Sequence, residues 1–570
     1  MLAVLLVATA LRTWKLDSLP HGLCGDEAIE ALQGVALWNG EKLPELAVPR
    51  IPYPRWPVWC AVSGLSTAIG GTNMAAVRAP SVFAGLAAVV LAFLTGRMLL
   101  GRTAGTGAAA FLAFSFWHVH FSRIGVPFHL SVAESLLIAL LLLRPSALGW
   151  RSGAAAAAVA VVACLGYAGS LVVPAIAVMF MAIRLAFRPA GVREYGLAAG
   201  FAGVAVPGAV LLLAMRPESA GRILDVGLAS PGLWPAQAAE CLRNYCVPVR
   251  AKGGFWQNYP AGSARFAPIE FAFILAGLAA AGLRGSLARW QSCALGSWWA
   301  VSLLPEVLPG GGTHLIRALS QLAPVALVAG AGAAGIAGLG RAGAAATLVL
   351  FALAGAHTWT RFFDRFANDT QAMGWHNALE ARIAGRVNEL ARKSPILLTP
   401  PVAYPSALRF HLLKGVKSGS IEYSTRELAQ SSLLEVFREP ASQQPVFFVF
   451  EAGKPSGGRR HIGLVNIFGL LREGDNAYWM RRYRQAEDQF RGVLAMVPDS
   501  AAARGHLGLA LASQGKCREA EPHLRYALNF SPQDGKLRRA LDACAGNALK
   551  GKGSAGRVGR TVPKGASKPE

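Results

Sequence analysis

The chain has 570 residues, of which 53% are apolar and only 15% are charged, and its mean hydropathy is +0.38. Soluble domains carry about 25% charged residues, so this composition excludes an ordinary soluble enzyme and indicates a membrane protein. The formal net charge is +24. The basic residues do not alternate with aromatic ones as in a nucleic-acid-binding surface, so no nucleic-acid partner is expected.

Apolar runs dominate residues 1–358, and we predict about eleven membrane-spanning helices in this transmembrane domain. Residues 1–11 form the first span rather than a signal peptide, because the run lacks a basic start and a small-residue cleavage site. The other runs are long enough to cross or nearly cross a hydrocarbon core as helix. They cover residues 81–99, 103–116, 127–143, 153–167, 170–187, 195–215, 268–283, 292–308, 315–339 and 342–357.

The short loops between these runs predict the orientation. One alternating set is rich in arginine and almost free of acid, which is typical of cytoplasmic loops. Its arginines are Arg97, Arg102, Arg144, Arg151, Arg184, Arg188, Arg193, Arg284, Arg289 and Arg341. The other set, 12–80, 117–126, 216–267 and 309–314, is then extracytoplasmic, and so is the carboxyl-terminal region.

Two adjacent carboxylates follow the first span. Residues 16–28 form a turn rich in proline and glycine that ends in Asp26 and Glu27, and residues 29–39 predict a short amphipathic helix. Aspartate is a favoured helix N-cap, and on spacing alone Asp26 is best interpreted as the cap of this helix. The alternative is that the pair faces a reaction at the membrane surface.

Cysteine usage predicts little chemistry. The eight cysteines lack the spacing of metal ligands, so a zinc site built on thiolates is not expected. Only Cys241 and Cys246 are placed for a disulfide.

Three further external segments carry basic or aromatic residues in a particular order. Residues 121–128 contain Arg123, and residues 312–324 contain His314 and Arg317 before a proline-containing span. Residues 258–268 hold an Asn-Tyr-Pro and an Arg-Phe-Ala-Pro sequence. Together with residues 16–28, this order resembles the protein-mannosyltransferase-like branch of the GT-C glycosyltransferases, which use dolichyl- or polyprenyl-phosphate sugars.

The resemblance implies a GT-C-like fold and an inverting transfer of a hexose, by family default mannose. The donor would be a polyprenyl-phosphate sugar, and the acceptor a hydroxyl of a protein, lipid or glycan. Asp26 would be the general base, with Glu27 as helper or ligand of a divalent metal, whose presence stays open. The same resemblance implies a bacterial inner membrane protein.

Phosphate needs cationic ligands, and arginine supplies a planar fork that binds two phosphate oxygens. Arg123 and Arg317 are the candidates, with His314 assisting; the alternative is that both arginines only snorkel at the interface. The histidines His118, His120 and His129 are expected to be solvated turn residues. A second acid could come from Glu218, Asp225, Glu240 or Glu306.

Residues 359–473 have a mixed pattern that predicts a small extracytoplasmic α/β domain. A helical stretch covers residues 377–393, and strand-like runs cover 396–399 and 446–450.

Residues 474–548 contain an internal repeat. Gly474, Ala486 and Pro498 recur as Gly508, Ala520 and Pro532, an offset of about 34 residues, which is the period of tetratricopeptide repeats. The large residue Phe490 is matched by Leu524. We predict two repeats with a capping helix, which either stabilise the α/β domain or bind a partner protein, followed by a disordered basic tail over 549–570.

Other functions fit a polytopic chain with repeats. A transporter or flippase would need ionisable residues within its spans, and here the spans carry little beyond Glu134. A polysaccharide polymerase or ligase would place its chemistry in a late external loop. A non-catalytic scaffold displaying the repeats is the third alternative.

Overall fold

The structure is a computed structural model of the whole chain. The residues that it describes are 1–40, 56–144, 149–187, 191–215, 231–246, 264–283, 288–309, 315–369, 372–373, 376, 378–391, 396–398, 432–438, 445–452 and 461–553. The chain forms two compact units, one built from Met1–Ala384 with Pro405–Leu413, and the other from Gly385–Tyr404 with Lys414–Glu570.

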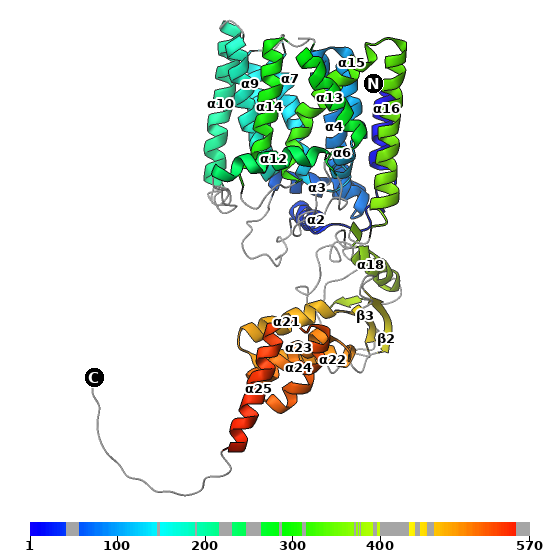
Figure 1. Ribbon diagram of the computed structural model, residues 1–570, viewed down its shortest axis with the longest axis vertical. Coiled ribbons are helices and arrows are strands. Elements are labelled where there is room, and N and C mark those ends of the chain that lie inside the picture. Colours follow the sequence, from blue (N-terminus) through cyan, green and yellow to red (C-terminus); the bar gives the residue numbers. More distant parts are fainter. Residues whose placement is uncertain are drawn as a thin grey trace, which may run out of the picture. The chain divides into compact units, whose positions relative to one another are not determined.

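The first unit is helical throughout its described part (Figure 1). Its amino-terminal half contains α1 (Leu2–Thr13), α2 (Gly25–Trp38), α3 (Pro57–Gly70), α4 (Met74–Leu100), α5 (Arg102–Phe114), α6 (Phe116–Phe121), η1 (Pro127–His129), α7 (Leu130–Leu143), α8 (Trp150–Gly166), η2 (Ala168–Leu171) and α9 (Val172–Phe187). The rest contains α10 (Val192–Met215), η3 (Pro231–Leu233), α12 (Trp234–Cys246), α13 (Pro268–Leu283), α14 (Arg289–Val307), η4 (Arg317–Gln321), α15 (Leu322–Ala337), α16 (Arg341–Trp359) and the π-helical turn η5 (Thr360–Phe366). Helix α18 (Ala378–Ala391) runs across the boundary between the units.

The composition of these helices makes the first unit a multi-pass membrane body. Among the described residues, 4 helices are long and apolar enough to cross a membrane: Met74–Leu100, Gly169–Phe187, Arg317–Ala337 and Arg341–Phe366. Shorter apolar helices cover Leu2–Thr13, Pro57–Gly70, Pro127–Leu143, Trp150–Gly166 and Pro268–Ala281. A total of eleven spans therefore stays a prediction.

Helix α4 shows how local sequence sets an element that later positions the site. The Asn73 side chain accepts a hydrogen bond from the backbone N of Ala76 at 2.9 Å and caps the helix. The helix then continues for 27 residues and ends before Gly101, whose φ is 95°. At about 1.5 Å per residue it is roughly 40 Å long, enough to span a bilayer.

Short helices gather at one end of the bundle. Figure 1 shows α2, α3 and α12 at the same end of the long helices. Helices α2 and α3 meet at Gly34 and Gly64, where a β-carbon on Gly34 would lie 2.6 Å from the carbonyl oxygen of Cys60. Only glycine allows backbones to approach this closely, so these two residues fix how α2 lies on α3.

The second unit contains a four-stranded sheet in the order β1-β4-β3-β2. Its strands are β1 (Ile396–Leu398), β2 (Ser432–Arg438), β3 (Pro445–Ala452) and β4 (His461–Asn466). Strands β1 and β4 are parallel, with Ile396 opposite Ile462, and the other pairs are antiparallel. Strand β1 lies within the run at 396–399 that the sequence predicted as a strand, and β3 covers the predicted run at 446–450.

Helical hairpins follow the sheet: α21 (Ile467–Trp479), α22 (Tyr483–Met496), α23 (Ala501–Ser513), α24 (Cys517–Phe530) and α25 (Gly535–Gly553). The same contact occurs in both pairs. A β-carbon on Gly474 would lie 2.5 Å from the ring of Phe490, and one on Gly508 would lie 2.7 Å from Leu524. The helix α25 enters the predicted tail, and residues 554–570 lie outside the described residues.

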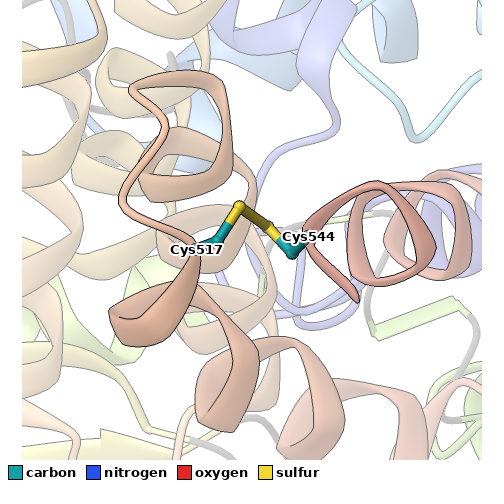
Figure 2. The surroundings of a disulfide bond; sticks show 2 residues. All are labelled: Cys517 and Cys544. Carbon is teal, nitrogen blue, oxygen red and sulfur yellow. A yellow bond between two sulfur atoms is a disulfide. The ribbon is translucent and has the colours of Figure 1, made fainter. Parts of the chain in front are cut away.

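One disulfide, Cys517–Cys544, occurs among the described cysteines, and Figure 2 shows it joining the start of α24 to α25. The expectation of a bond between Cys241 and Cys246 is wrong. Cys241 is buried, Cys246 is exposed, and both are free thiols. The partners of the real bond are 27 residues apart in sequence and meet only because the last hairpin folds back.

Replacing both Cys517 and Cys544 by serine should lower the free energy of unfolding of the helical hairpins by about 3 to 4 kcal/mol, because the bond closes a loop of this length in the unfolded chain. Hydrogen exchange of the α23 and α24 amides in the full chain measures the loss. The control is Cys246→Ser at an exposed free thiol. Equal protection in wild type and double variant would contradict the prediction.

Candidate active site

The first loop ends in a capped helix that carries both candidate carboxylates. Cys24 is the N-cap of α2, and its backbone N donates to Glu27 Oε2 at 2.9 Å, which completes a capping box. Asp26 is the second residue of the helix and is half-buried. The interpretation of Asp26 as the cap is therefore wrong, because the N-cap is Cys24, two residues before Asp26, and Glu27 makes the reciprocal bond.

Glu27 is fully buried in an ion pair. Its Oε1 lies 3.2 Å from Nε of Arg78, which is also fully buried, and accepts a hydrogen bond from the backbone N of Gly125 at 2.7 Å. Burial alone would raise the pKa of Glu27, but the charge of Arg78, together with the Gly125 amide, outweighs burial and lowers the pKa to about 2. Glu27 is thus a permanent carboxylate that ties α2 to α4 and to the loop of residues 122–126.

Arg78 also holds the first loop. Its Nη1 donates to the carbonyl of Leu16 at 3.0 Å, and its Nη2 donates to the carbonyls of Pro20 and Gly22. All of these acceptors lie in the turn that precedes Asp26. A single buried guanidinium therefore sets the backbone of that turn.

Arg123 also holds this loop, together with the end of α1. It is fully buried and donates to the carbonyls of Leu11 at 2.8 Å, Trp14 at 2.7 Å and Leu19 at 3.1 Å. Its guanidinium carbon also lies 4.7 Å and 4.9 Å from the ring centres of Phe362 and Phe363. These contacts give Arg123 a clear part in positioning the loop, whereas a contact with phosphate stays a prediction.

The three histidines near Arg123 are not solvated, contrary to expectation. His118, His120 and His129 are each fully buried. His118 Nδ1 lies 2.8 Å from Nη2 of Arg12, and His129 Nε2 lies 2.9 Å from the carbonyl oxygen of Ser81. The turn around them packs beneath neighbouring helices, which a linear reading of loop residues does not reveal.

Arg317 begins the short helix η4 on another part of the same unit, and η4 packs against η1, which follows the Arg123 loop. The side chain is half-buried and makes no hydrogen bond or ion pair to a residue within the described ranges. Its expected neighbour His314 lies outside the described residues, as do Glu218 and Asp225. Of the other possible second acids, Glu240 is half-buried in α12.

A buried polar network anchors η4. Arg265 donates to both carboxylate oxygens of Glu306, and Gln321 Nε2 donates to Glu306 Oε2 at 3.0 Å. Tyr245 donates to the side-chain oxygen of Gln321 and accepts from Trp299 Nε1 at 3.0 Å. Glu306 therefore has a structural role, because both of its carboxylate oxygens are engaged by Arg265 and Gln321, which does not suit a second catalytic acid.

One group of side chains has the composition of a metal site. Cys24, Glu27 and His376 are buried, and their ligand atoms all lie within 4.8 Å of one another. Burial, reinforced by Glu27 and Asp26, raises the pKa of the Cys24 thiol. Burial also lowers the pKa of His376, despite the neighbouring Glu27, so this imidazole is neutral at pH 7.

The tertiary structure thus gathers Glu27 and Arg123 around the loop that carries Asp26 and adds two residues that sequence reasoning missed. Arg78 was detectable in principle as a lone charge just before an apolar run. His376 had no local signal, because it is about 350 residues away from Cys24.

The sequence matches no protein-family model and no curated protein. Solved structures show a distant similarity. ArnT from Cupriavidus metallidurans bound to undecaprenyl phosphate is 14% identical, with a TM-score of 0.46 over 73% of this chain and 85% of ArnT. The Archaeoglobus fulgidus oligosaccharyltransferase AglB, in complex with an inhibitory peptide and a dolichol-phosphate, is 14% identical, with a TM-score of 0.43 over 72% of this chain and 63% of AglB.

The arabinofuranosyltransferase AftD from Mycobacteria is 15% identical, with a TM-score of 0.39 over 74% of this chain and 31% of AftD. All three TM-scores lie below 0.5, so these similarities do not establish a common fold.

Replacing Arg78 by glutamine should lower the free energy of unfolding by about 3 to 5 kcal/mol, because it leaves the buried Glu27 carboxylate without its ion-pair partner. Equilibrium unfolding in detergent measures the change. Arg97→Gln, at an exposed position on the same helix, should change stability by less than about 0.5 kcal/mol. Equal stability of the two variants would contradict the structural role given to Arg78.

Proposed function

We propose that the chain is an integral-membrane glycosyltransferase that moves a hexose from a polyprenyl-phosphate donor to a hydroxyl acceptor on the extracytoplasmic side. The observation that carries the proposal is the way two buried arginines fix the loop before Asp26. Arg78 and Arg123 together donate hydrogen bonds to the carbonyl oxygens of Leu11, Trp14, Leu16, Leu19, Pro20 and Gly22. A backbone held so firmly suits a catalytic group that must keep its geometry.

Asp26 is the proposed general base. The acceptor oxygen forms a bond to the anomeric carbon as the bond from that carbon to the phosphate oxygen breaks, and the acceptor proton passes to the Asp26 carboxylate. The polyprenyl phosphate leaves as an anion and needs no proton. The adjacent Glu27 is committed to Arg78 and Gly125, so it supports α2 rather than exchanging protons.

Arg317 is the proposed ligand of the donor phosphate. Its fork is not engaged by another described side chain, and the helix beneath it is anchored through Gln321 and Glu306. Arg123 is proposed to act mainly by positioning, since its donors already serve the first loop. His314 is the proposed second ligand of the donor phosphate, and mannose is the first hexose to test.

The helical hairpins α21 to α24 are proposed to be two tetratricopeptide repeats, with α25 as the capping helix. Support comes from the two glycine contacts that recur with the offset of the sequence repeat. The Cys517–Cys544 bond favours an oxidising compartment for this unit, in keeping with the extracytoplasmic side of a bacterial inner membrane. The proposed role of the repeats is to bind the acceptor or a partner protein.

Asp26→Asn should abolish transfer, because the amide keeps the shape of the side chain but cannot accept the proton. Purified protein in liposomes is incubated with radiolabelled polyprenyl-phosphate hexoses and membrane acceptors, and transferred label is counted. Asp17→Asn, at an exposed acid of the same loop, serves as the control and should retain activity. Equal transfer by both variants would remove Asp26 from the chemistry, and no transfer by wild type would favour a non-catalytic scaffold.

Arg317→Gln should raise the KM for the donor by about 10- to 100-fold, the cost of losing a hydrogen bond to a charged group. Donor titrations at saturating acceptor measure this effect. Arg289→Gln, at an exposed position at the start of α14, should leave KM unchanged. If Arg317→Gln lowers only the amount of folded protein and leaves KM alone, Arg317 is not the phosphate ligand.

A further inference from the structure

Cys24, Glu27 and His376 form a ready set of metal ligands in the first unit. A thiol, a carboxylate and an imidazole each direct an atom into one buried space, and these atoms all lie within 4.8 Å of one another. Around tetrahedral Zn²⁺, bonds of about 2.0 to 2.3 Å place ligand atoms about 3.3 to 3.7 Å apart. We propose that these three residues bind one Zn²⁺ ion.

His376 supplies the independent observation. Its side chain is buried, yet among the described residues neither ring nitrogen finds a hydrogen-bond partner. Its Nδ1 lies 3.7 Å from Glu27 Oε2, which is too far for a hydrogen bond. Buried polar atoms are rarely left in this way, and a metal ion between these two side chains would satisfy both.

The ion pair with Arg78 does not block the site, because Glu27 divides its two oxygens. Oε1 takes Arg78 and the Gly125 amide, whereas Oε2 takes the Cys24 amide and faces His376. Arg78 and Gly125 then serve as outer partners that orient a ligating carboxylate, an arrangement common around protein-bound metals.

Binding exchanges the thiol proton for one divalent cation. The Cys24 thiol gives its proton to solvent and becomes a thiolate, Glu27 is already ionised, and the imidazole of His376 binds in its neutral form. Two negative ligands meet the double positive charge of zinc, and the charge of Arg78 remains. This mixed set of sulfur, nitrogen and oxygen ligands suits zinc better than Mg²⁺ or Ca²⁺, which prefer oxygen ligands alone.

The ion would join the segment after the last predicted span to the first turn of α2, with Asp26 lying between two of its ligands in sequence. Bound zinc would therefore hold the turn that carries Asp26 in place. Three protein ligands leave the fourth coordination position of the ion open. Binding of the ion does not depend on the proposed transferase activity, so the two ideas fail separately.

The first experiment measures metal content. Tag-free full-length protein is purified from zinc-supplemented cells without chelator, and metals are counted by inductively coupled plasma mass spectrometry. One zinc per chain is expected, with at least a tenfold loss in Cys24→Ser and in His376→Gln. The controls are Cys60→Ser, at another buried cysteine, and His357→Gln, at a half-buried histidine, and both should retain the ion.

A second measurement does not depend on how well a variant folds. Wild-type protein stripped of metal and loaded with Co²⁺ should show the absorption band of a thiolate-to-cobalt charge transfer, and zinc should displace it. Chelation should lower the midpoint of thermal unfolding, and added zinc should restore it. Wild-type protein without bound metal, or zinc retained in both Cys24→Ser and His376→Gln, would overturn the proposal.

Discussion

The structure of the site depends on the buried ion pair between Glu27 and Arg78. Removing two charges from water is costly, and one partner alone would be strongly destabilising. The pair is stable because both side chains make further hydrogen bonds that replace those lost to water. The Glu27 carboxylate also accepts hydrogen bonds from the backbone amides of Cys24 and Gly125. Arg78 also donates to carbonyl oxygens of the first loop. One ion pair thus joins α2, α4 and the loops that contain Leu16 and Gly125.

The loop that leads to Asp26 is held by Arg78 and Arg123. Only part of this loop is buried, and backbone carbonyls that water cannot reach there must be satisfied by protein donors. Arg78 and Arg123 provide several donors each from fixed positions, and Arg123 is itself held against Phe362 and Phe363. The loop is therefore set before any ligand arrives, which is the condition for placing one carboxylate accurately.

His376 contributes to the same region from near the carboxyl-terminal end of the first unit. A residue behind the last predicted span meets the capping box of α2, so the two ends of the unit converge on the same helical turn. A metal ion there would couple the stability of the fold to the geometry of Asp26. The cysteine spacing gave no hint of this, since only one thiol takes part and its partners are a carboxylate and an imidazole.

The sequence alone determined the membrane class, many of the helices, two of the strands and the hairpin repeat, because hydropathy, periodicity and turn composition act over short distances. It misassigned the cap of α2, the three buried histidines and the disulfide. Those features, with the roles of Arg78 and His376, follow from contacts between segments far apart in the chain. Burial and pairing of polar groups are properties of packed neighbours, and only the tertiary structure decides which neighbours a residue has.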